Sequence, residues 1–275
     1  MTHASDATLV THADSRVMTH VTRDLGRGAA ALKAATSVVV FTGAGISAES
    51  GLPTFRSGFN AMWKEADIAR YANPRGYRAH APDSYRWYRM RVDMAASVEP
   101  NAGHRAIVGI ERRAPAFTLV TQNVDGLHRR AGSRNVLELH GHLRDARCFD
   151  CGIHTEWPPV AAEPVCAECG GLLRPNVVMF EENLSAPTLE SAREAARTCD
   201  LLISVGTSNL VWPARELPEY AHENGATVII VNPDLGGQMR EDARCLHLQG
   251  SAGDILPRLG SVAWDADASY MSHQA

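Results

Sequence analysis

The chain has 275 residues, of which 45% are hydrophobic and 21% are charged, an ordinary globular composition with enough length for one large or two modest domains. Its formal net charge of −4 gives no basic surface for nucleic acid. No apolar run approaches the roughly 18 residues that a membrane helix needs, so neither sequence-specific nucleic-acid binding nor membrane insertion is expected.

Residues 1–24 are expected to form a flexible tail. They lack the apolar core of a signal peptide, and Asp6 and Asp14 fit poorly with an acid-poor transit peptide, so we expect a cytoplasmic protein. The triplet MTH occurs at residue 1 and again at Met18. A translation start at Met18 is therefore a second hypothesis for the N-terminus.

Short β-branched runs indicate the strands. The run SVVVF at 37–41 precedes the turn TGAG, and similar runs cover 117–125, 201–209 and 226–234, the last two after expected helices at 188–198 and 213–224. Strands that alternate with helices predict an α/β fold, with a parallel sheet covered by helices on both faces. Ligands of such folds collect at the carboxyl ends of the strands, where all four runs carry small or polar residues.

Two stretches interrupt this alternation. Residues 57–100 are rich in Trp, Tyr, Arg and Pro and predict a helical insertion. Residues 146–174 hold two cysteine pairs and few helix formers. The polar residues after Leu259, apart from Trp264, are expected to form a loose tail.

The cysteine pairs give the strongest single signal, because Cys148-x-x-Cys151 is followed after fourteen residues by Cys166-x-x-Cys169. Each pair forms a knuckle that places two thiolates about 2.3 Å from one Zn²⁺, and two knuckles complete a tetrahedron. Four sulfur ligands leave no open position, so the zinc is expected to be structural. Redox activity is the alternative, but such motifs usually occur singly.

Two polar motifs follow expected strands. GAGISAESG at 43–51 suits a phosphate-binding turn, although it is not G-x-G-x-x-G and a tight turn without ligand explains it equally well. TQNVDGLH at 121–128 places hydrogen-bonding groups on both faces of a strand end. His140 comes fifteen residues after Asp125, and with an ordinary pKa of about 6.5 it is a natural proton acceptor. His142 is the alternative.

Taken together, the motifs GAGISAESGLPTFR, TQNVDGLH, LHGH, the paired C-x-x-C, VGTSNLVWPA and VNPD resemble the sirtuins in order and spacing, over about residues 25–258. The resemblance implies a Rossmann-like NAD-binding domain (25–56, 101–145 and 175–259), a smaller helical and zinc-binding domain (57–100 and 146–174) and a C-terminal tail (260–275). NAD, a co-substrate, and an acyl-lysine protein substrate would enter the cleft between the two domains from opposite sides.

The resemblance also implies roles for individual residues. In this family NAD is cut at its nicotinamide bond and the acyl group moves from lysine to ADP-ribose. His140 would be the general base that takes a proton from a ribose hydroxyl. The cofactor-binding residues would be Gly43, Ala44, Gly45, Ser47, Phe55, Arg56, Gln122, Asn123, Asp125, Gly206, Thr207, Ser208, Asn232 and Ala252.

Two details resemble the class III branch, which removes succinyl and malonyl groups. Thr54 replaces the aspartate of the wider family's PDFR, and Tyr88 and Arg91 match that branch's Tyr-x-x-Arg pair. On one helical face the pair could hold the carboxylate of an acidic acyl group. The alternative is a surface helix rich in arginine, since Arg86 and Arg89 lie nearby.

The expected substrate-binding strand contains one departure from the family. Val177, Val178 and Phe180 would bind the peptide, but Met179 and Glu181 stand where the family usually has Trp and Gly. The expected function is NAD-dependent lysine deacylation, mainly of succinyl- and malonyl-lysine. The alternatives are ordinary deacetylation, protein ADP-ribosyl transfer and a non-catalytic NAD-binding or zinc-scaffold protein.

Overall fold

The computed structural model describes residues 24–54, 65–158 and 164–264. Residues 24–34 are helical and precede the first strand. The further elements are β1 (Ser37–Thr42), α2 (Gly45–Ala48), α3 (Glu65–Tyr71), α4 (Pro74–Ala79), α5 (Ala81–Ser97), α6 (Ala102–Arg113), β2 (Ala116–Thr121), α7 (Leu127–Ala131), β3 (Val136–Glu138), β4 (Gly141–Cys148), β5 (His154–Thr155), β6 (Leu173–Val177), α8 (Ala186–Thr198), β7 (Leu201–Val205), η1 (Ala214–Glu216), α9 (Leu217–Glu223), β8 (Thr227–Asn232), β9 (Cys245–Gln249) and α10 (Ala252–Trp264).

The larger sheet has six strands in the order β3-β2-β1-β7-β8-β9, and every neighbouring pair is parallel. The chain winds from β1 outward through β2 and β3, then returns to the other side of β1 and winds outward again from β7. The winding direction therefore reverses between β1 and β7. Ligands of open α/β sheets bind at the carboxyl ends of the strands at such a reversal.

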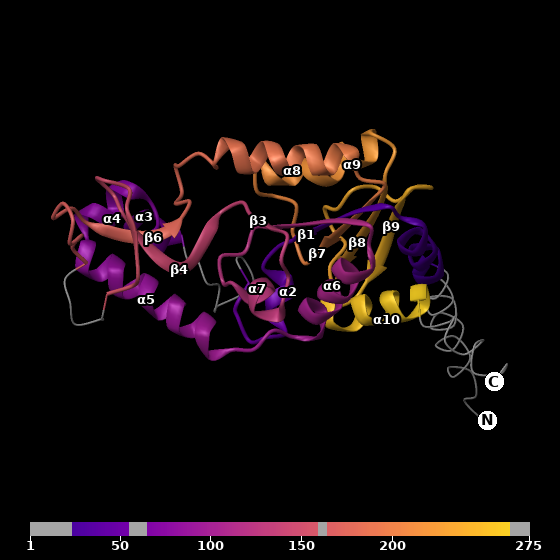
Figure 1. The fold of residues 1–275 in the computed structure, drawn as a ribbon, viewed down its shortest axis with the longest axis horizontal. Coiled ribbons are helices and arrows are strands. Elements are labelled where there is room, and N and C mark those ends of the chain that lie inside the picture. The colour runs from indigo at the N-terminus through magenta and orange to yellow at the C-terminus, as the bar shows by residue number, and fades with distance from the viewer. Residues whose placement is uncertain (1–23, 55–64, 159–163, 265–275) are drawn as a thin grey trace, which may run out of the picture.

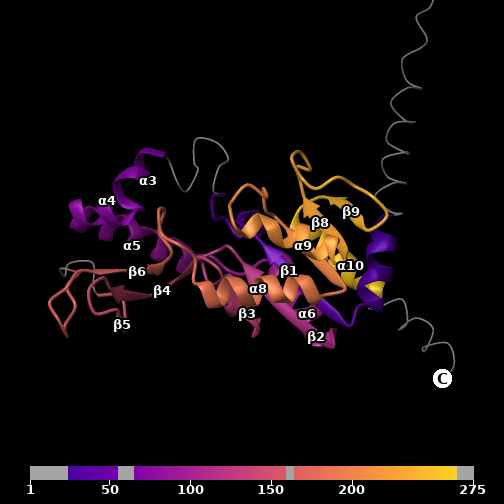
Figure 2. The same cartoon turned by 90° about the horizontal axis from the view of Figure 1, so that it is seen from above.

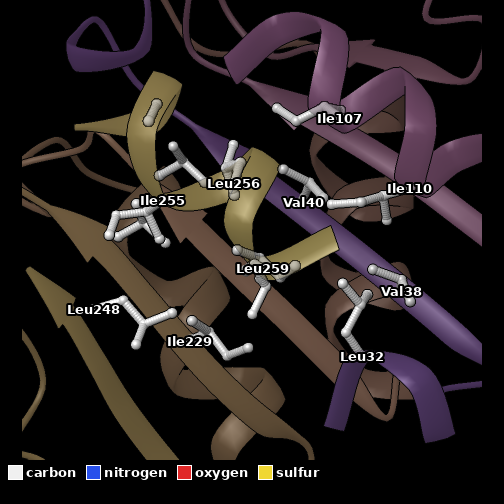
Figure 3. Packing of buried hydrophobic residues seen from close by; sticks show 14 of the residues in the cluster. Leu32, Val38, Val40, Ile107, Ile110, Ile229, Leu248, Ile255, Leu256 and Leu259 are labelled. Atoms are coloured by element: carbon white, nitrogen blue, oxygen red, sulfur yellow. The ribbon is translucent and has the colours of Figure 1, made fainter. Parts of the chain in front are cut away.

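One face of this sheet is covered by helical residues 24–34, α6 and α10 (Figures 1 and 2). Successive strand residues point to opposite faces, so Val38 and Val40 of β1 face this layer. Leu256 and Leu259 of α10 meet them together with Ile107 of α6 (Figure 3). Packing of these apolar side chains fixes the helices against the strands whose carboxyl ends form the expected ligand-binding edge of the sheet.

The opposite face is covered by α8 and α9 (Figures 1 and 2). Val39 and Phe41 of β1 belong to this second cluster, as do Ala192 of α8 and Leu217 of α9. The alternation along β1 thus buries both faces of the sheet, as the continuous apolar run of its sequence predicts. The predicted parallel sheet with helices on both faces is confirmed.

A smaller unit lies beside one end of the large sheet (Figure 1). It consists of the antiparallel sheet β5-β4-β6 and helices α3 to α5. Its core is aromatic: Tyr77, Trp87 and Tyr88 pack against Val177 and Met179. Both predicted interruptions of the alternating pattern, so far as their residues are described, therefore contribute to one unit.

The structure moves several expected boundaries. Strands β4 and β6 pair with each other, so residues 141–145 and 175–177 belong to the smaller sheet and not to the large one. The tail expected from residue 260 is wrong for 260–264, because α10 continues to Trp264 and buries Ala263. Asp24, expected in the N-terminal tail, is helical and buried. Among the described residues, no helix is both long and apolar enough to cross a membrane.

Candidate active site and metal centre

A cavity of about 690 Å³ contains most of the predicted site residues. Its volume lies within the range of about 300–1,000 Å³ that is typical of small-molecule sites. Residues from both units line it, so the site lies where the larger and smaller sheets meet. The predicted residues in its lining are Gly43, Ala44, Gly45, Ser47, Tyr88, Arg91, Gln122, Asn123, Asp125, His140, Val177, Val178, Phe180, Gly206, Thr207, Ser208 and Asn232.

Gly45 and Gly206 lie in close contact at the edge of the sheet where the winding reverses. A Cβ atom on Gly45 would lie 2.7 Å from the Gly206 Cα, and one on Gly206 would lie 2.5 Å from the Ile46 nitrogen. The Gly45 amide donates to the Gly206 carbonyl at 2.8 Å, and Gly206 has a φ of 59°. Only glycine allows this approach of the two chain segments after β1 and β7. The same lack of side chains leaves a backbone surface open toward the cavity.

The polar groups that follow β1 and β2 are joined by hydrogen bonds. The Ser47 hydroxyl donates to Asp125 Oδ2 at 2.8 Å, and the Asn123 amide donates to the Gly43 carbonyl at 3.1 Å. The Leu127 amide donates to the other Asp125 oxygen at 2.9 Å. Burial raises the pKa of the Asp125 carboxyl, while the hydrogen bonds from Leu127 and Ser47 lower it. The predicted turn and the predicted strand end therefore form one rigid wall of the cavity.

His140 lies between the large sheet and the smaller one. Its ring Nδ1 lies 2.8 Å from the Gln122 carbonyl oxygen. A carbonyl oxygen can only accept, so Nδ1 carries the proton and Nε2 has the free lone pair. Burial lowers the pKa of His140 below its ordinary value, and the bond to Gln122 opposes this shift. A neutral imidazole with one accepting nitrogen in a cavity is suited to general-base chemistry.

His142 lies outside the lining of the cavity. Its Nε2 is 3.3 Å from the Asn176 amide nitrogen and its Nδ1 is 3.4 Å from Asp145 Oδ1. Of the two histidines that the sequence leaves open as base, the structure brings His140 to the cavity.

Thr207 connects the two halves of the sheet edge. Its hydroxyl accepts from the Gln122 side chain at 3.0 Å, and its carbonyl accepts from Asn232 at 3.2 Å and from Gln238 at 3.0 Å. The Asn209 amide in turn donates to Gln238 at 2.7 Å. The predicted residues after β2, β7 and β8 are thus linked, and Gln238 and Asn209 join a network that the sequence motifs did not indicate.

Tyr88 and Arg91 lie on α5 and both line the cavity. The Arg91 guanidinium stacks on the Trp87 ring, 3.1 Å from its centroid, and donates to the Trp87 carbonyl at 2.8 Å. Burial lowers the pKa of Arg91 to about 10. Tyr88 is buried against Tyr77 and Trp87, with ring centroids 5.9 and 4.8 Å away. A cationic residue and a tyrosine from α5 therefore both belong to the lining of the cavity.

The other two arginines of this helix point elsewhere. Arg86 pairs with Asp83 at 2.5 Å, and Arg89 pairs with Asp93 at 3.1 Å. These aspartates are about half exposed, with side-chain exposures of 46% and 58%. The arginines of α5 are therefore divided between an outer face and the face that lines the cavity.

Three predicted cofactor residues are not among the described residues that line the cavity. Phe55 and Arg56 lie outside the described residues. Ala252 begins α10 and is buried in the core of the large unit, where its Cβ would lie 3.0 Å from a Cβ on Gly103. The contact between Ala252 and the adenine stays a prediction.

Sequence reasoning missed part of the lining. Some of these residues lie within or beside the motifs, which would have been a usable signal: Val124 in TQNVD, Val211 and Trp212 in VGTSNLVWPA, and Asp234 in VNPD. Others, such as Ala72 and Ala95, carry no local signal because only the packing of the helices brings them to the cavity. Leu52, Pro53, Leu143, Glu182 and Leu184 were missed as well, whereas the sequence singles out Thr54, Met179 and Glu181 only as departures from the wider family's motifs.

The four cysteines of the paired motif form a cluster at one end of the smaller sheet. One sulfur atom from each lies within 4.8 Å of all the others, with 3.5 Å between Cys148 and Cys169 and 3.8 Å between Cys151 and Cys166. Tetrahedral Zn–S bonds of about 2.3 Å require sulfur separations of about 3.8 Å. None of the four forms a disulfide. The donor set therefore fits a structural zinc ion, as the spacing predicted.

Comparison with known proteins gives consistent matches. The sequence model of the Sir2 family matches residues 43–213. The NAD-dependent protein deacylase of Methylococcus capsulatus is 42% identical over 241 residues, which is 84% of this chain and 93% of the relative.

Solved structures with bound ligands also match the fold. A Sir2 homologue in complex with NAD has a TM-score of 0.77 at 36% identity, covering 86% of this chain and 93% of that one. Sir2Af2 bound to a myristoylated histone peptide has a TM-score of 0.71 at 33% identity, covering 90% of this chain and 99% of that one.

Proposed function

This chain belongs to the Sir2 family, and we propose that it removes acidic acyl groups, succinyl and malonyl, from protein lysines. The coarser activity is that of an NAD-dependent protein deacylase. NAD supplies the acyl acceptor, because cleavage of its nicotinamide bond leaves an ADP-ribosyl group that takes the acyl group. The remaining roles belong to residues of this chain.

We assign the catalytic base to His140 and the acyl-lysine channel to the part of the cavity between α5 and the segment after β6. His140 has an accepting Nε2 in the cavity, held in place through the Gln122 carbonyl. Residues after β1, β2, β7 and β8 surround the opposite part, where the winding of the sheet reverses, and suit the dinucleotide. Gly43, Gly45 and Gly206 would bring backbone close to its phosphates.

The observation that carries the acyl preference is the position of Arg91. Arg91 belongs to the lining of the cavity, whereas Arg86 and Arg89 lie on the outer face of the same helix. A pKa of about 10 keeps Arg91 charged at neutral pH. A carboxylate that enters the cavity loses water, and a charge-assisted hydrogen bond to the Arg91 guanidinium would compensate for that loss. An acetyl group offers nothing to that charge.

The test is a panel of one peptide carrying acetyl-, malonyl-, succinyl- or glutaryl-lysine under matched NAD, with kcat/KM measured for each. Arg91→Met preserves length and removes charge, so succinyl turnover should fall about ten- to a hundredfold, the effect of a hydrogen bond to a charged group. Acetyl turnover should barely change. Arg89→Met is the matched control, because Arg89 lies on the same helix and pairs outward with Asp93.

Several outcomes of this panel separate the alternatives. A wild-type preference for acetyl-lysine would reject the acidic acyl assignment and leave a deacetylase. Equal losses on all acyl groups in Arg91→Met would make Arg91 structural. ADP-ribose appearing on protein without loss of an acyl group would favour ADP-ribosyl transfer, and absence of acyl-dependent nicotinamide release would favour a binding protein.

The proposed partners are acylated protein segments. Relatives of the same fold have been solved with a myristoylated histone peptide and with a p53 peptide. A peptide would reach the cavity beside Phe180 and Trp212, which line it and are 39% and 61% exposed. We place the protein in the cytoplasm, because reduced cysteines that bind metal suit a reducing compartment.

A further inference from the structure

Arg174, the second residue of β6, is buried, with a side chain that is 3% exposed. Its guanidinium donates to both carboxylate oxygens of Glu182, with 2.7 Å from Nη2 to Oε2. The same Nη2 donates to the Val177 carbonyl at 2.8 Å. Burying a guanidinium is costly unless its hydrogen bonds and charge are satisfied. We call this contact of the Arg174 guanidinium with Glu182 and the Val177 carbonyl the fork, and its geometry is fixed by these bonds.

Two of the partners of Arg174, Val177 and Glu182, begin and end one segment, residues 177–182. Inside that segment, Glu182 Oε2 also accepts from the Met179 amide at 2.8 Å, and the Glu182 amide donates to the Met179 carbonyl at 3.1 Å. The loop is thereby closed around the guanidinium. Glu181, at its turn, has a φ of 70°. A non-glycine residue persists in that region only where its surroundings fix the backbone.

The closed segment lines the cavity. Its outer amides bind the two walls: Val178 donates to the His140 carbonyl at 2.8 Å, and Phe180 donates to the Ala72 carbonyl at 2.9 Å. All six residues from Val177 to Glu182 contribute to the lining. A change in the shape of this segment therefore changes the side of the cavity that we assign to the acyl peptide.

Arg174 is supported from the side of the metal cluster. Its guanidinium lies 4.7 Å from the centroid of Phe149, a residue between the zinc ligands Cys148 and Cys151. The Phe149 ring lies 5.5 Å from Tyr77, and the Tyr77 hydroxyl donates to the Leu173 carbonyl at 3.0 Å. The Cys148–Cys151 knuckle therefore supplies, through Phe149, the aromatic surface on which the Arg174 guanidinium packs.

We propose that Arg174 is a positioning residue for the acyl peptide: seated on Phe149, it holds residues 177–182 in the shape that binds the substrate. This rests on the proposed deacylase function. Lysine has a compact ammonium and cannot span both carboxylate oxygens and the Val177 carbonyl at once. Among the described residues, no hydrogen bond, ion pair or ring contact joins Arg174 or Glu182 to the segments after β1 and β7, so the affinity for NAD should not depend on Arg174.

Arg174→Lys tests the proposal in two measurements. The KM for the acyl peptide should rise about tenfold or more, from loss of charge-assisted hydrogen bonds, while kcat changes less and the KM for NAD stays within about twofold. Hydrogen exchange of the amides in 177–182 should accelerate in the same variant, without any substrate. Arg147→Lys is the control: Arg147 lies 3.9 Å from the same carboxylate but is 37% exposed, so neither measurement should move.

A paired variant separates positioning from folding. Arg174→Met with Glu182→Leu removes both charges, so no buried charge is left unpaired and the protein should fold. Its peptide KM should remain high. A wild-type peptide KM in the folded pair, equal losses for NAD and peptide, or unchanged hydrogen exchange in Arg174→Lys would each overturn the proposal. If the wild-type protein turns over no acyl peptide, the deacylase proposal fails, and the exchange measurement still decides on Arg174.

Discussion

His140 forms one hydrogen bond through its ring and another through its backbone carbonyl. Its ring donates through Nδ1 to the Gln122 carbonyl at 2.8 Å, and its own carbonyl accepts from the Val178 amide at 2.8 Å. The ring bond fixes the tautomer, while the backbone bond fixes the segment that follows β6. The side chain therefore supplies the basic nitrogen, and the main chain supplies part of the cavity wall.

Replacing His140 by alanine should remove the base and keep the wall. We expect turnover to fall by about 10²- to 10⁴-fold, the usual contribution of a positioned general base. The affinity for NAD, measured by titration, should stay near that of the wild type. His142→Ala is the matched control two residues away, since His142 contacts Asn176 and Asp145 outside the lining.

The pH profile gives an independent check on the same residue. Burial lowers the pKa of His140 from its ordinary 6.5, so the neutral, accepting form persists to lower pH. The acidic limb of kcat should therefore have its midpoint below 6.5. A midpoint above that value, or near-normal turnover in His140→Ala, would move the role of base to another group.

At the scale of elements, the sheet edge depends on the crossing of two turns. Gly206 and Gly237 both have left-handed backbones, with φ of 59° and 73°. A Cβ on Gly237 would meet nothing within 4 Å, whereas one on Gly206 would lie 2.5 Å from the Ile46 nitrogen. Comparing alanine substitutions at these two glycines therefore separates the cost of backbone strain from the cost of steric contact.

Alanine at Gly237 should cost about 1–2 kcal/mol, the strain of a left-handed residue with a side chain. Alanine at Gly206 should cost more, because the turns after β1 and β7 must also move apart, and it should raise the KM for NAD. Denaturant unfolding and steady-state kinetics measure the two effects. Equal costs for both variants would contradict the close approach.

The cysteine cluster gives a second prediction at this scale. Cys166→Ser should lose the zinc and much of the soluble protein, because binding of a structural metal contributes directly to folding free energy. Cys199→Ala is the control, since Cys199 is a buried core residue of the large unit outside the cluster. Metal analysis should give one zinc per chain in the control. Well-folded wild-type protein without zinc would refute the site.

The sequence pattern predicted the central strands well and the outer elements poorly. Runs such as SVVVF at β1 are apolar throughout because both faces are buried, and this signal is local. Strand β9, Cys245–Gln249, alternates with polar residues and lies at the edge of the sheet, so its run was too weak. Residues 260–264 were misassigned because their helix depends on packing against the sheet, which composition does not report.

The site was predictable where chemistry and spacing coincide. Four cysteines in two pairs identify the metal centre, and the polar strand ends identify the rim of the cavity. The fork of Arg174 and Glu182 had no signal, because eight residues and a change of direction separate the two partners. Such contacts follow from tertiary packing alone.

For the whole molecule, two buried histidines connect stability to pH. The rings of His104 and His128 lie 4.8 Å apart, and His128 Nε2 lies 2.9 Å from the Thr42 hydroxyl. Burial lowers the pKa of His104 to about 4 and that of His128 to about 3, from an ordinary 6.5. Between pH 6.5 and about 4, the two histidines are protonated in the unfolded chain but remain neutral in the folded chain.

Stability should therefore rise with pH across this window and be lost as pH falls below about 6.5. Each such histidine contributes a slope of up to about 1.4 kcal/mol per pH unit. Urea unfolding between pH 7 and pH 5 measures the slope, and His104→Gln should make it shallower. A flat profile over this range would contradict the burial of neutral histidines.

The hydrogen bond from the Val178 amide to the His140 carbonyl has a practical consequence, because it uses no atom of the imidazole. An enzyme disabled at His140 would keep residues 177–182 in place and would hold its targets without completing turnover. Immobilised and loaded with NAD, such a protein would serve as bait for acylated proteins from a cell extract. The modified lysines it retained, read by mass spectrometry, would give the list of physiological targets.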